Sequence, residues 1–255
     1  MKKFQLRRML CCTAALLCLL LCACGSTDPD APVTTADGTV IPTVDVLQFR
    51  EPAPDDFVAV FATDAGEFAA VLFLDAAPLA VQNFVTLARQ GVYDGLDFHR
   101  TVEDFIIQSG DTNGYGGQSI WRGGFSAEYS DLLHHYTGAL AMAGTERNHS
   151  QFFVVNCPTD SVPSALQEQM RTDGWSEDVI TAYAQTGGAP YLDNLHTVFG
   201  HVFYGMDTVR SIGALPKDAD AAVLQSVTIT TYDDWCALHP DAEPAFYTPA
   251  ADAAG

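Results

Sequence analysis

A series of short, apolar segments rich in β-forming residues is the feature that most restricts how this chain can fold. Residues 57–63 (FVAVFAT) and 67–74 (EFAAVLFL) flank the turn signal Asp64-Ala65-Gly66, so we expect them to form a hairpin. Further strands are predicted at residues 97–102, 105–109, 140–142, 152–156, 197–202 and 222–232. Longer helical patterns occur within this framework only at residues 78–91 and 206–215. Many short strands with two framework helices predict a mostly β fold, built as a closed antiparallel barrel.

Residues 161–190 interrupt this pattern with two helix-like pieces, at 164–171 and 176–185. Ser176 is a suitable cap for the second piece, and Gly187-Gly188 follows its end. The stretch is therefore predicted to be a helical insertion. It either packs on the barrel wall as a structural addition or acts as a lid or substrate-selecting element.

The chain opens with the layout of a secretory signal, in which basic residues precede an apolar run from residue 9 to residue 23. This run is shorter than the roughly 20 apolar residues that a membrane-spanning helix needs. It ends in Leu21-Cys22-Ala23-Cys24, which resembles a bacterial lipobox. We therefore expect a lipoprotein signal peptide at residues 1–23 and a lipid on Cys24, which would anchor the protein on the outer side of the cell membrane. Cleavage near Ala23 without lipidation, or an uncleaved anchor, is the alternative.

Two further segments have the composition of loosely packed chain. Residues 24–55 are rich in Thr, Asp, Pro and Ala, with few large apolar residues, and are predicted to be a flexible tether. Residues 233–255 are rich in Ala, Asp and Pro and predict a loosely packed C-terminal tail. The predicted folded domain is therefore residues 56–232.

Charge and cysteine placement exclude several classes of function. A formal net charge of −20 repels phosphate backbones, so nucleic acid is not expected as a partner. Outside the N-terminal segment the only cysteines are Cys157 and Cys236, and the sequence has no CxxC pair, which argues against a zinc site or a redox motif. A disulfide between these two cysteines would require an oxidising compartment and close approach of the two residues.

Common catalytic constellations are absent from the sequence. It contains no GxSxG, GxGxxG, phosphate-binding Gly-Lys-Ser/Thr loop or HExxH motif. His134 and His135 are adjacent, and adjacent strand residues point to opposite faces, so they are not expected to share a metal ion. We predict neither a metal nor a cofactor.

Three dense blocks of residues carry the functional signal instead. They are FHR (98–100) with FIIQSGD (105–111), TGALAMA (137–143) with SQFF (150–153), and LD (192–193) with HTVFG (196–200). Together and in this order they resemble the cyclophilin family of peptidyl-prolyl isomerases, over residues 57–232. The resemblance implies an eight-stranded barrel closed by two helices, with an active groove on its outer surface and residues 161–190 as an added piece.

The resemblance also implies roles for single residues. Arg100 matches the family's catalytic arginine. Gln108, as its catalytic partner, and Gln151 match polar residues that orient the arginine and the substrate. Ala143 matches a position whose backbone pairs with the substrate chain. The positions that receive the substrate proline are matched by Phe105, Ile106, Phe153, Leu192 and His196, with Tyr191 as an aromatic wall where many members have tryptophan. A second departure is Glu103-Asp104, which stands where a Pro-Gly turn is usual.

Rotation about an X-Pro bond needs only groups of this kind. Its barrier of about 18–20 kcal/mol arises because amide resonance must be broken. In the twisted state the prolyl nitrogen regains a lone pair, and a guanidinium such as that of Arg100 can donate a hydrogen bond to this nitrogen only then. Because arginine stays charged at ordinary pH, we expect a nearly flat pH–rate profile between about pH 6 and 9.

We therefore expect a monomeric peptidyl-prolyl isomerase that acts on unfolded or newly exported polypeptides. A catalytically weak cyclophilin-like module that binds peptides or acts as a chaperone is the second interpretation, because Tyr191 and the insertion depart from the family pattern. A structural lipoprotein or adhesin on an unrelated β fold is the third. The candidate residues also have purely structural alternatives, such as a surface salt bridge for Arg100 and packing as a neutral side chain for His196.

Overall fold

The computed structural model describes residues 33–34, 40–41, 46–216 and 218–245. The predicted signal peptide, the predicted lipidation site Cys24 and most of the predicted tether lie outside the described residues. Of the helices that are described, none is long and apolar enough to cross a membrane. Near the start of the described chain, β1 (Val33–Thr34) and β2 (Val40–Ile41) pair with each other in antiparallel orientation.

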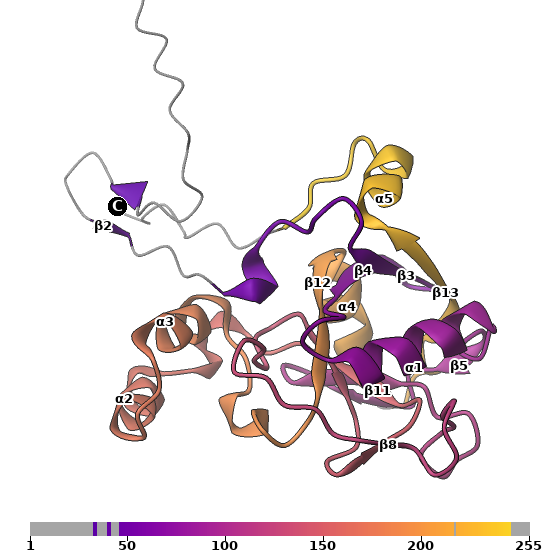
Figure 1. Cartoon of the computed structure of the whole chain (residues 1–255), viewed down its shortest axis with the longest axis horizontal. Coiled ribbons are helices and arrows are strands. Elements are labelled where there is room, and N and C mark those ends of the chain that lie inside the picture. The colour runs from indigo at the N-terminus through magenta and orange to yellow at the C-terminus, as the bar shows by residue number, and fades with distance from the viewer. Residues whose placement is uncertain (1–32, 35–39, 42–45, 217, 246–255) are drawn as a thin grey trace, which may run out of the picture. The chain divides into compact units, whose positions relative to one another are not determined.

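One antiparallel sheet of nine strands forms the framework (Figure 1). In sheet order its strands are β5 (Leu96–Asp97), β13 (Val223–Thr231), β3 (Phe57–Thr63), β4 (Gly66–Leu72), β12 (Val198–Tyr204), β9 (Ala139–Met142), β11 (Phe152–Val155), β7 (Ile106–Ser109) and β6 (Arg100–Val102). The hairpin predicted around Asp64-Ala65-Gly66 is the β3–β4 pair. The predicted mostly β, antiparallel fold is thus confirmed.

The strand count differs from the predicted eight because residues 97–102 form two strands instead of one. Asp97 in β5 pairs with Val223 in β13, whereas Arg100 in β6 pairs with Gln108 in β7, at the other end of the strand order. Phe98, whose ring is buried, lies between the two strands, where the chain changes its pairing partner from β13 to β7. The predicted closed barrel is therefore seen as a curled sheet whose two edge strands are linked by Phe98 and His99.

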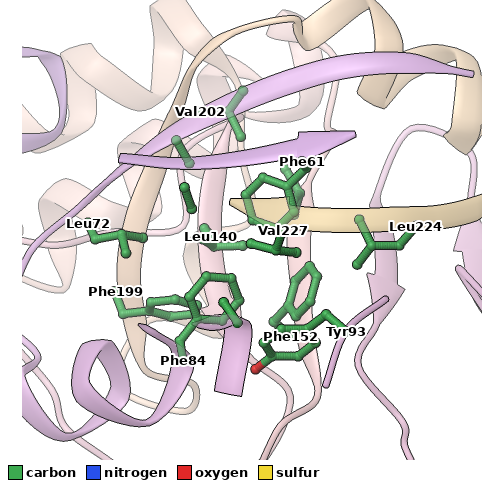
Figure 2. Packing of buried hydrophobic residues seen from close by; sticks show 14 of the residues in the cluster. Phe61, Leu72, Phe84, Tyr93, Leu140, Phe152, Phe199, Val202, Leu224 and Val227 are labelled. Carbon is green, nitrogen blue, oxygen red and sulfur yellow. The ribbon is translucent and has the colours of Figure 1, made fainter. Parts of the chain in front are cut away.

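Alternation along the strands sorts the apolar side chains into two clusters on opposite faces of the sheet. In β11, Phe152 joins one cluster and Phe153 the other, and in β7 Ile107 and Ile106 divide in the same way. We call the first the α1-side cluster, because it packs against α1 (Pro78–Arg89). Figure 2 shows its centre, where the ring of Phe84 from α1 meets Phe152 edge to face at 5.6 Å. We call the second the far-side cluster, and it underlies the candidate site.

Helix α1 begins without a side-chain cap of its own, since its N-cap residue is Ala77. The carboxylate of Glu128, from a loop 48 residues away in sequence, accepts the backbone N–H of Leu79 at 3.0 Å and that of Ala80 at 2.9 Å. These are two of the N–H groups that the first helical turn leaves unpaired, and a negative charge there also complements the helix dipole. Glu128 therefore fixes the helix to the loop between β8 (Phe125–Ser126) and β9.

The predicted insertion contains α2 (Ser164–Thr172) and α3 (Glu177–Thr186), which lie side by side in Figure 1. Ser176 caps α3 as expected, accepting the N–H of Val179 at 3.4 Å. The insertion has its own apolar cluster, in which Tyr183 from α3 packs on Tyr136 with ring centroids 4.4 Å apart. Tyr136 precedes β9, so this cluster joins the insertion to the framework.

The remaining elements are shorter. They are α4 (Met206–Gly213), the paired strands β8 (Phe125–Ser126) and β10 (Arg147–Asn148), and the 3-10 turns η1 (Leu47–Phe49), η2 (Thr159–Ser161) and η3 (Pro190–Leu192). Helix α4 corresponds to the predicted second framework helix.

The described parts of two segments predicted to be loose, residues 46–55 and 233–245, contain side chains that pack on the domain. Gln48, within the stretch assigned to the tether, is only 2% exposed and bonds to the backbone of His134 through both its amide atoms. After β13 the chain forms α5 (Tyr232–Leu238), in which Trp235 is 1% exposed against Phe203. Both segments are poor in large apolar residues, but Val46, Leu47 and Trp235 pack into the apolar clusters of the domain.

Candidate active site

Arg100, Gln108 and Gln151 form a chain of hydrogen bonds across neighbouring strands. Nη1 of Arg100 donates to Oε1 of Gln108 at 3.3 Å, and Nε2 of Gln108 donates to Oε1 of Gln151 at 2.9 Å. The ladders explain this arrangement, because Gln108 lies opposite Arg100 on one side and opposite Phe153 on the other. Arg100 is exposed, so its guanidinium is held from one side and remains accessible at the surface.

The residues predicted to bind the substrate, five of them in the far-side cluster, gather beside this chain. Members of the far-side cluster among them are Phe105, Ile106, Ala143, Phe153 and Leu192. Ile106 and Phe153 are 2% and 3% exposed, so they form the base, while the other three are partly exposed above it. The result is an apolar surface next to a fixed cation.

His196 completes this surface. Its ring meets Phe153 edge to face, with centroids 5.3 Å apart, and its Nδ1 lies 3.1 Å from the carbonyl oxygen of Met142. Burial lowers the pKa of His196 below its usual value, and the nearby His135 adds to this effect. His196 is therefore neutral above about pH 7, which suits an apolar contact.

Tyr191 stands at the outer edge of the site and is 63% exposed. Its ring stacks on Phe105, with centroids 6.2 Å apart and planes inclined by 29°. The residue that replaces the more usual tryptophan thus still presents an aromatic face beside the cluster.

The turn between β6 and β7 forms without the Pro-Gly pair that is usual in the family. Asp104 adopts φ 57°, in the left-handed region, and Phe105 donates its N–H to the carbonyl of Val102 at 3.1 Å. Aspartate is one of the few residues other than glycine that enter this region readily. The turn holds Phe105 in place beside Tyr191.

The histidines 134 and 135 do not point to opposite faces, so that part of the sequence argument is wrong. They lie in a loop rather than a strand, and both Nδ1 atoms meet the same carboxylate of Asp193, each at 2.7 Å. No set of three or more residues suited to a metal ion is found within the described ranges. Sequence reasoning missed this cluster, since no periodic pattern relates a loop to a turn 58 residues later.

The two cysteines of the body are both free thiols. Cys157 is buried beneath the site, with Sγ 3.8 Å from the carbonyl oxygen of Phe105. Burial, with a further contribution from Asp104, raises the pKa of its thiol to about 11, so it is not an activated nucleophile.

Comparison with known proteins points to one family. The chain matches the family model described as "Cyclophilin type peptidyl-prolyl cis-trans isomerase/CLD" over residues 58–233. A relative from Staphylococcus haemolyticus (strain JCSC1435), named "Putative peptidyl-prolyl cis-trans isomerase", is 40% identical over 189 residues, which are 71% of this chain and 94% of the relative. A relative of the same name from Staphylococcus aureus (strain USA300) is 38% identical over 188 residues, covering 72% of this chain and 94% of the relative.

A solved structure agrees with the sequence relatives. It is a cyclophilin type peptidyl-prolyl cis-trans isomerase from Cryptosporidium parvum, determined in the presence of the dipeptide Ala-Pro. It is 25% identical, with a TM-score of 0.54, and covers 68% of this chain and 99% of that chain. The fold and the matched residues together define a cyclophilin-type domain. The protein belongs to the cyclophilin family of peptidyl-prolyl cis-trans isomerases.

Proposed function

We propose that this protein catalyses rotation about X-Pro bonds in unfolded or newly exported polypeptides, working as a monomer on the outer side of the cell membrane. The observation that supports catalysis most directly is the hydrogen-bond chain from Arg100 through Gln108 to Gln151, beside the apolar surface around Phe153. It combines the two requirements of the reaction, a fixed donor and a place for the proline ring.

The proline ring of the substrate packs on Phe153 and Leu192, which holds the prolyl side of the bond still. The acyl side then rotates, and the prolyl nitrogen becomes pyramidal as amide conjugation is lost. Arg100 donates a hydrogen bond to the lone pair that appears on this nitrogen. Since the planar ground state has no such lone pair, the bond stabilises the transition state selectively and lowers the barrier.

Gln108 acts on Arg100 rather than on the substrate. An arginine side chain samples many rotamers when free, and fixing it before the reaction removes an entropic cost from the barrier. The amide of Gln108 is itself oriented by Gln151, so the direction of the guanidinium is set by two successive hydrogen bonds.

No step in this mechanism transfers a proton. Arginine stays charged across the ordinary pH range, and His196 is already neutral above about pH 7. We therefore expect kcat/KM to be nearly flat from pH 7 to pH 9, as measured with one proline peptide in a series of buffers. A step of tenfold or more within that range would contradict the mechanism.

The N-terminal sequence supports a location outside the cytoplasm. The lipobox-like Leu21-Cys22-Ala23-Cys24 supports lipidation at Cys24 and anchoring of the mature chain outside the cytoplasm. Expression of the full chain with a radiolabelled fatty acid tests this proposal. Wild-type protein should incorporate label and sediment with membranes, whereas Cys24→Ser should incorporate none. Equal labelling of the two proteins would contradict it.

A peptide-binding module with weak turnover is the second candidate. The exposed ring of Tyr191, stacked on Phe105, favours it because an aromatic surface can bind peptides without catalysing rotation. The two candidates separate in one experiment on the chain without its signal peptide, with tetrapeptides that vary the residue before proline. The proposed function predicts turnover, and peptide binding without measurable turnover would support the module instead.

A further inference from the structure

Asp193 is the centre of a buried hydrogen-bond cluster that the catalytic mechanism does not use. Its side chain is 5% exposed. Oδ1 accepts from the backbone N–H of His135 at 2.8 Å and lies 2.7 Å from Nδ1 of the same residue. Oδ2 lies 2.7 Å from Nδ1 of His134 and accepts the hydroxyl of Tyr183 at 2.9 Å.

These four contacts fit an ionised carboxylate. Such a group accepts about four hydrogen bonds and donates none, so both imidazoles must present Nδ1–H to it. Burial raises the pKa of Asp193, but the hydrogen bonds and charges of His134 and His135 outweigh burial and hold the pKa below its usual value. An asparagine could not reproduce the arrangement, because its amide nitrogen would face donors.

The cluster joins three parts of the chain, of which the loop with the two histidines lies 58 residues or more from Asp193. Tyr183 belongs to α3 of the insertion, and the histidines belong to the loop before β9. Asp193 itself directly follows Leu192, one of the apolar residues of the site, and the backbone turns there through His196, whose N–H donates to the carbonyl of Leu192 at 3.2 Å. The insertion therefore holds the segment that carries Leu192 and His196.

The ring of His135 extends the same connection to the base of the site. It stacks on Phe153 with centroids 6.0 Å apart and planes inclined by 17°, and it meets His196 edge to face at 6.2 Å. Its side chain is 1% exposed. Asp193 thus fixes, through His135, the underside of the surface on which we place the proline ring.

We propose that Asp193 is a positioning residue for proline binding, and that the insertion acts through the Tyr183–Asp193 hydrogen bond to hold the Leu192–His196 segment in its binding geometry. This inference rests on the proposed function, because it assigns proline binding to that segment. It gives the insertion a role in substrate affinity, not in the chemical step, since none of the cluster touches Arg100 or Gln108 in the described contacts.

Two isosteric variants of neighbouring tyrosines test this proposal. Tyr183→Phe removes only the hydroxyl that Asp193 accepts, and leaves the ring in its cluster. Tyr136→Phe is the matched control, because Tyr136 is equally buried in the same cluster and its hydroxyl has no hydrogen-bond partner among the described residues. Any loss caused by disturbing the cluster in general should appear in both.

The measurements are KM, kcat and backbone amide chemical shifts, on the chain without its signal peptide. We expect Tyr183→Phe to raise KM about three- to tenfold with kcat within about twofold of wild type, and Tyr136→Phe to change neither. Amide signals of Leu192, Asp193 and His196 should shift in Tyr183→Phe, while those of Arg100 and Gln108 should not. Asp193→Asn should give the same pattern with a larger rise in KM.

Three results would overturn the proposal. A wild-type KM with unshifted Leu192–His196 signals in Tyr183→Phe would show that the hydroxyl does not hold this segment. Equal changes in Tyr136→Phe would attribute the effect to general packing of the cluster. A fall in kcat alone would place the effect in the chemical step. If wild-type protein showed no turnover, the proposed function would fail. The chemical shifts and peptide affinity from the same spectra would still decide whether Tyr183 positions the segment.

Discussion

The guanidinium of Arg100 and the amide of Gln108 face each other across the β6–β7 ladder, joined by an Nη1–Oε1 hydrogen bond of 3.3 Å. Nε2 of the same amide donates to Oε1 of Gln151 at 2.9 Å, so the Gln108 side chain bonds to one neighbour through each of its polar atoms. The pairing of β6 with β7 therefore orients the guanidinium of Arg100, although this side chain is exposed. Replacing Gln108 therefore tests the orientation of Arg100 while the arginine itself stays in the chain.

Gln108→Leu should lower kcat/KM about tenfold, which corresponds to ~1.4 kcal/mol, without unfolding the protein. The variant keeps the size of the side chain but removes the acceptor for Arg100 and the donor for Gln151. Gln82→Leu, at an exposed position of α1, is the matched control and should keep wild-type activity. Equal activity in the two variants would show that Gln108 does not position the arginine.

Glu128→Ala should destabilise the domain by about 1–2 kcal/mol, because two N–H groups of the first turn of α1 lose their acceptor. Glu128→Gln retains one good acceptor but not the charge, and should cost about half as much. Urea unfolding followed by circular dichroism measures both. A variant as stable as wild type would mean that water replaces the carboxylate without loss.

The free energy of unfolding should also decrease on acidification, because of His201. Its side chain is buried, its Nδ1 lies 3.3 Å from Nε2 of Gln48, and burial lowers its pKa to about 3. In the unfolded chain a histidine titrates near pH 6.5, so between about pH 6.5 and 3 the unfolded state binds a proton that the folded state does not. The contribution is complete above pH 6.5 and is lost by about 1.4 kcal/mol per pH unit on acidification.

Unfolding free energies of wild type and His201→Leu at pH 7, 6, 5 and 4 isolate this term, because the other titrating groups are common to both proteins. We expect the wild-type curve to fall more steeply between pH 6 and 4. Parallel curves would show that folding does not lower the pKa of His201. Asp193 acts in a different window, since its lowered pKa gives stability that is lost only below about pH 4.

Much of the framework could be predicted from local patterns. The strand 57–63 has the predicted bounds in β3, and α1 begins at Pro78 as expected, because β-branched runs, turn residues and a proline at a helix start act within a few residues. The candidate site residues were assigned from the order of the matching segments, and their roles remain predictions. The structure brings Arg100, Gln108 and Gln151 into one hydrogen-bonded chain.

Features that depend on distant partners could not be predicted in this way. The break at Phe98 separates residues that pair with β13 from residues that pair with β7, and the packing of Gln48 depends on a loop 86 residues away. The Asp193 cluster is the clearest case, since loop geometry, not strand alternation, decides where His134 and His135 point. Helix α5, with the buried Trp235, lies in a segment whose average composition indicated a loose tail.

In the proposed mechanism Arg100 stabilises the rotating bond and not the bound peptide. The most direct test is exchange spectroscopy by NMR on a proline peptide at equilibrium, which measures the rate of cis–trans exchange and the peptide affinity in one sample. For Arg100→Ala we predict a fall of at least about 100-fold in the exchange rate, ~2.7 kcal/mol, with peptide affinity within about threefold of wild type. Arg122→Ala, an exposed arginine on another loop, should match wild type in both. An Arg100→Ala protein that remains folded, binds the peptide and exchanges it at the wild-type rate would contradict the account.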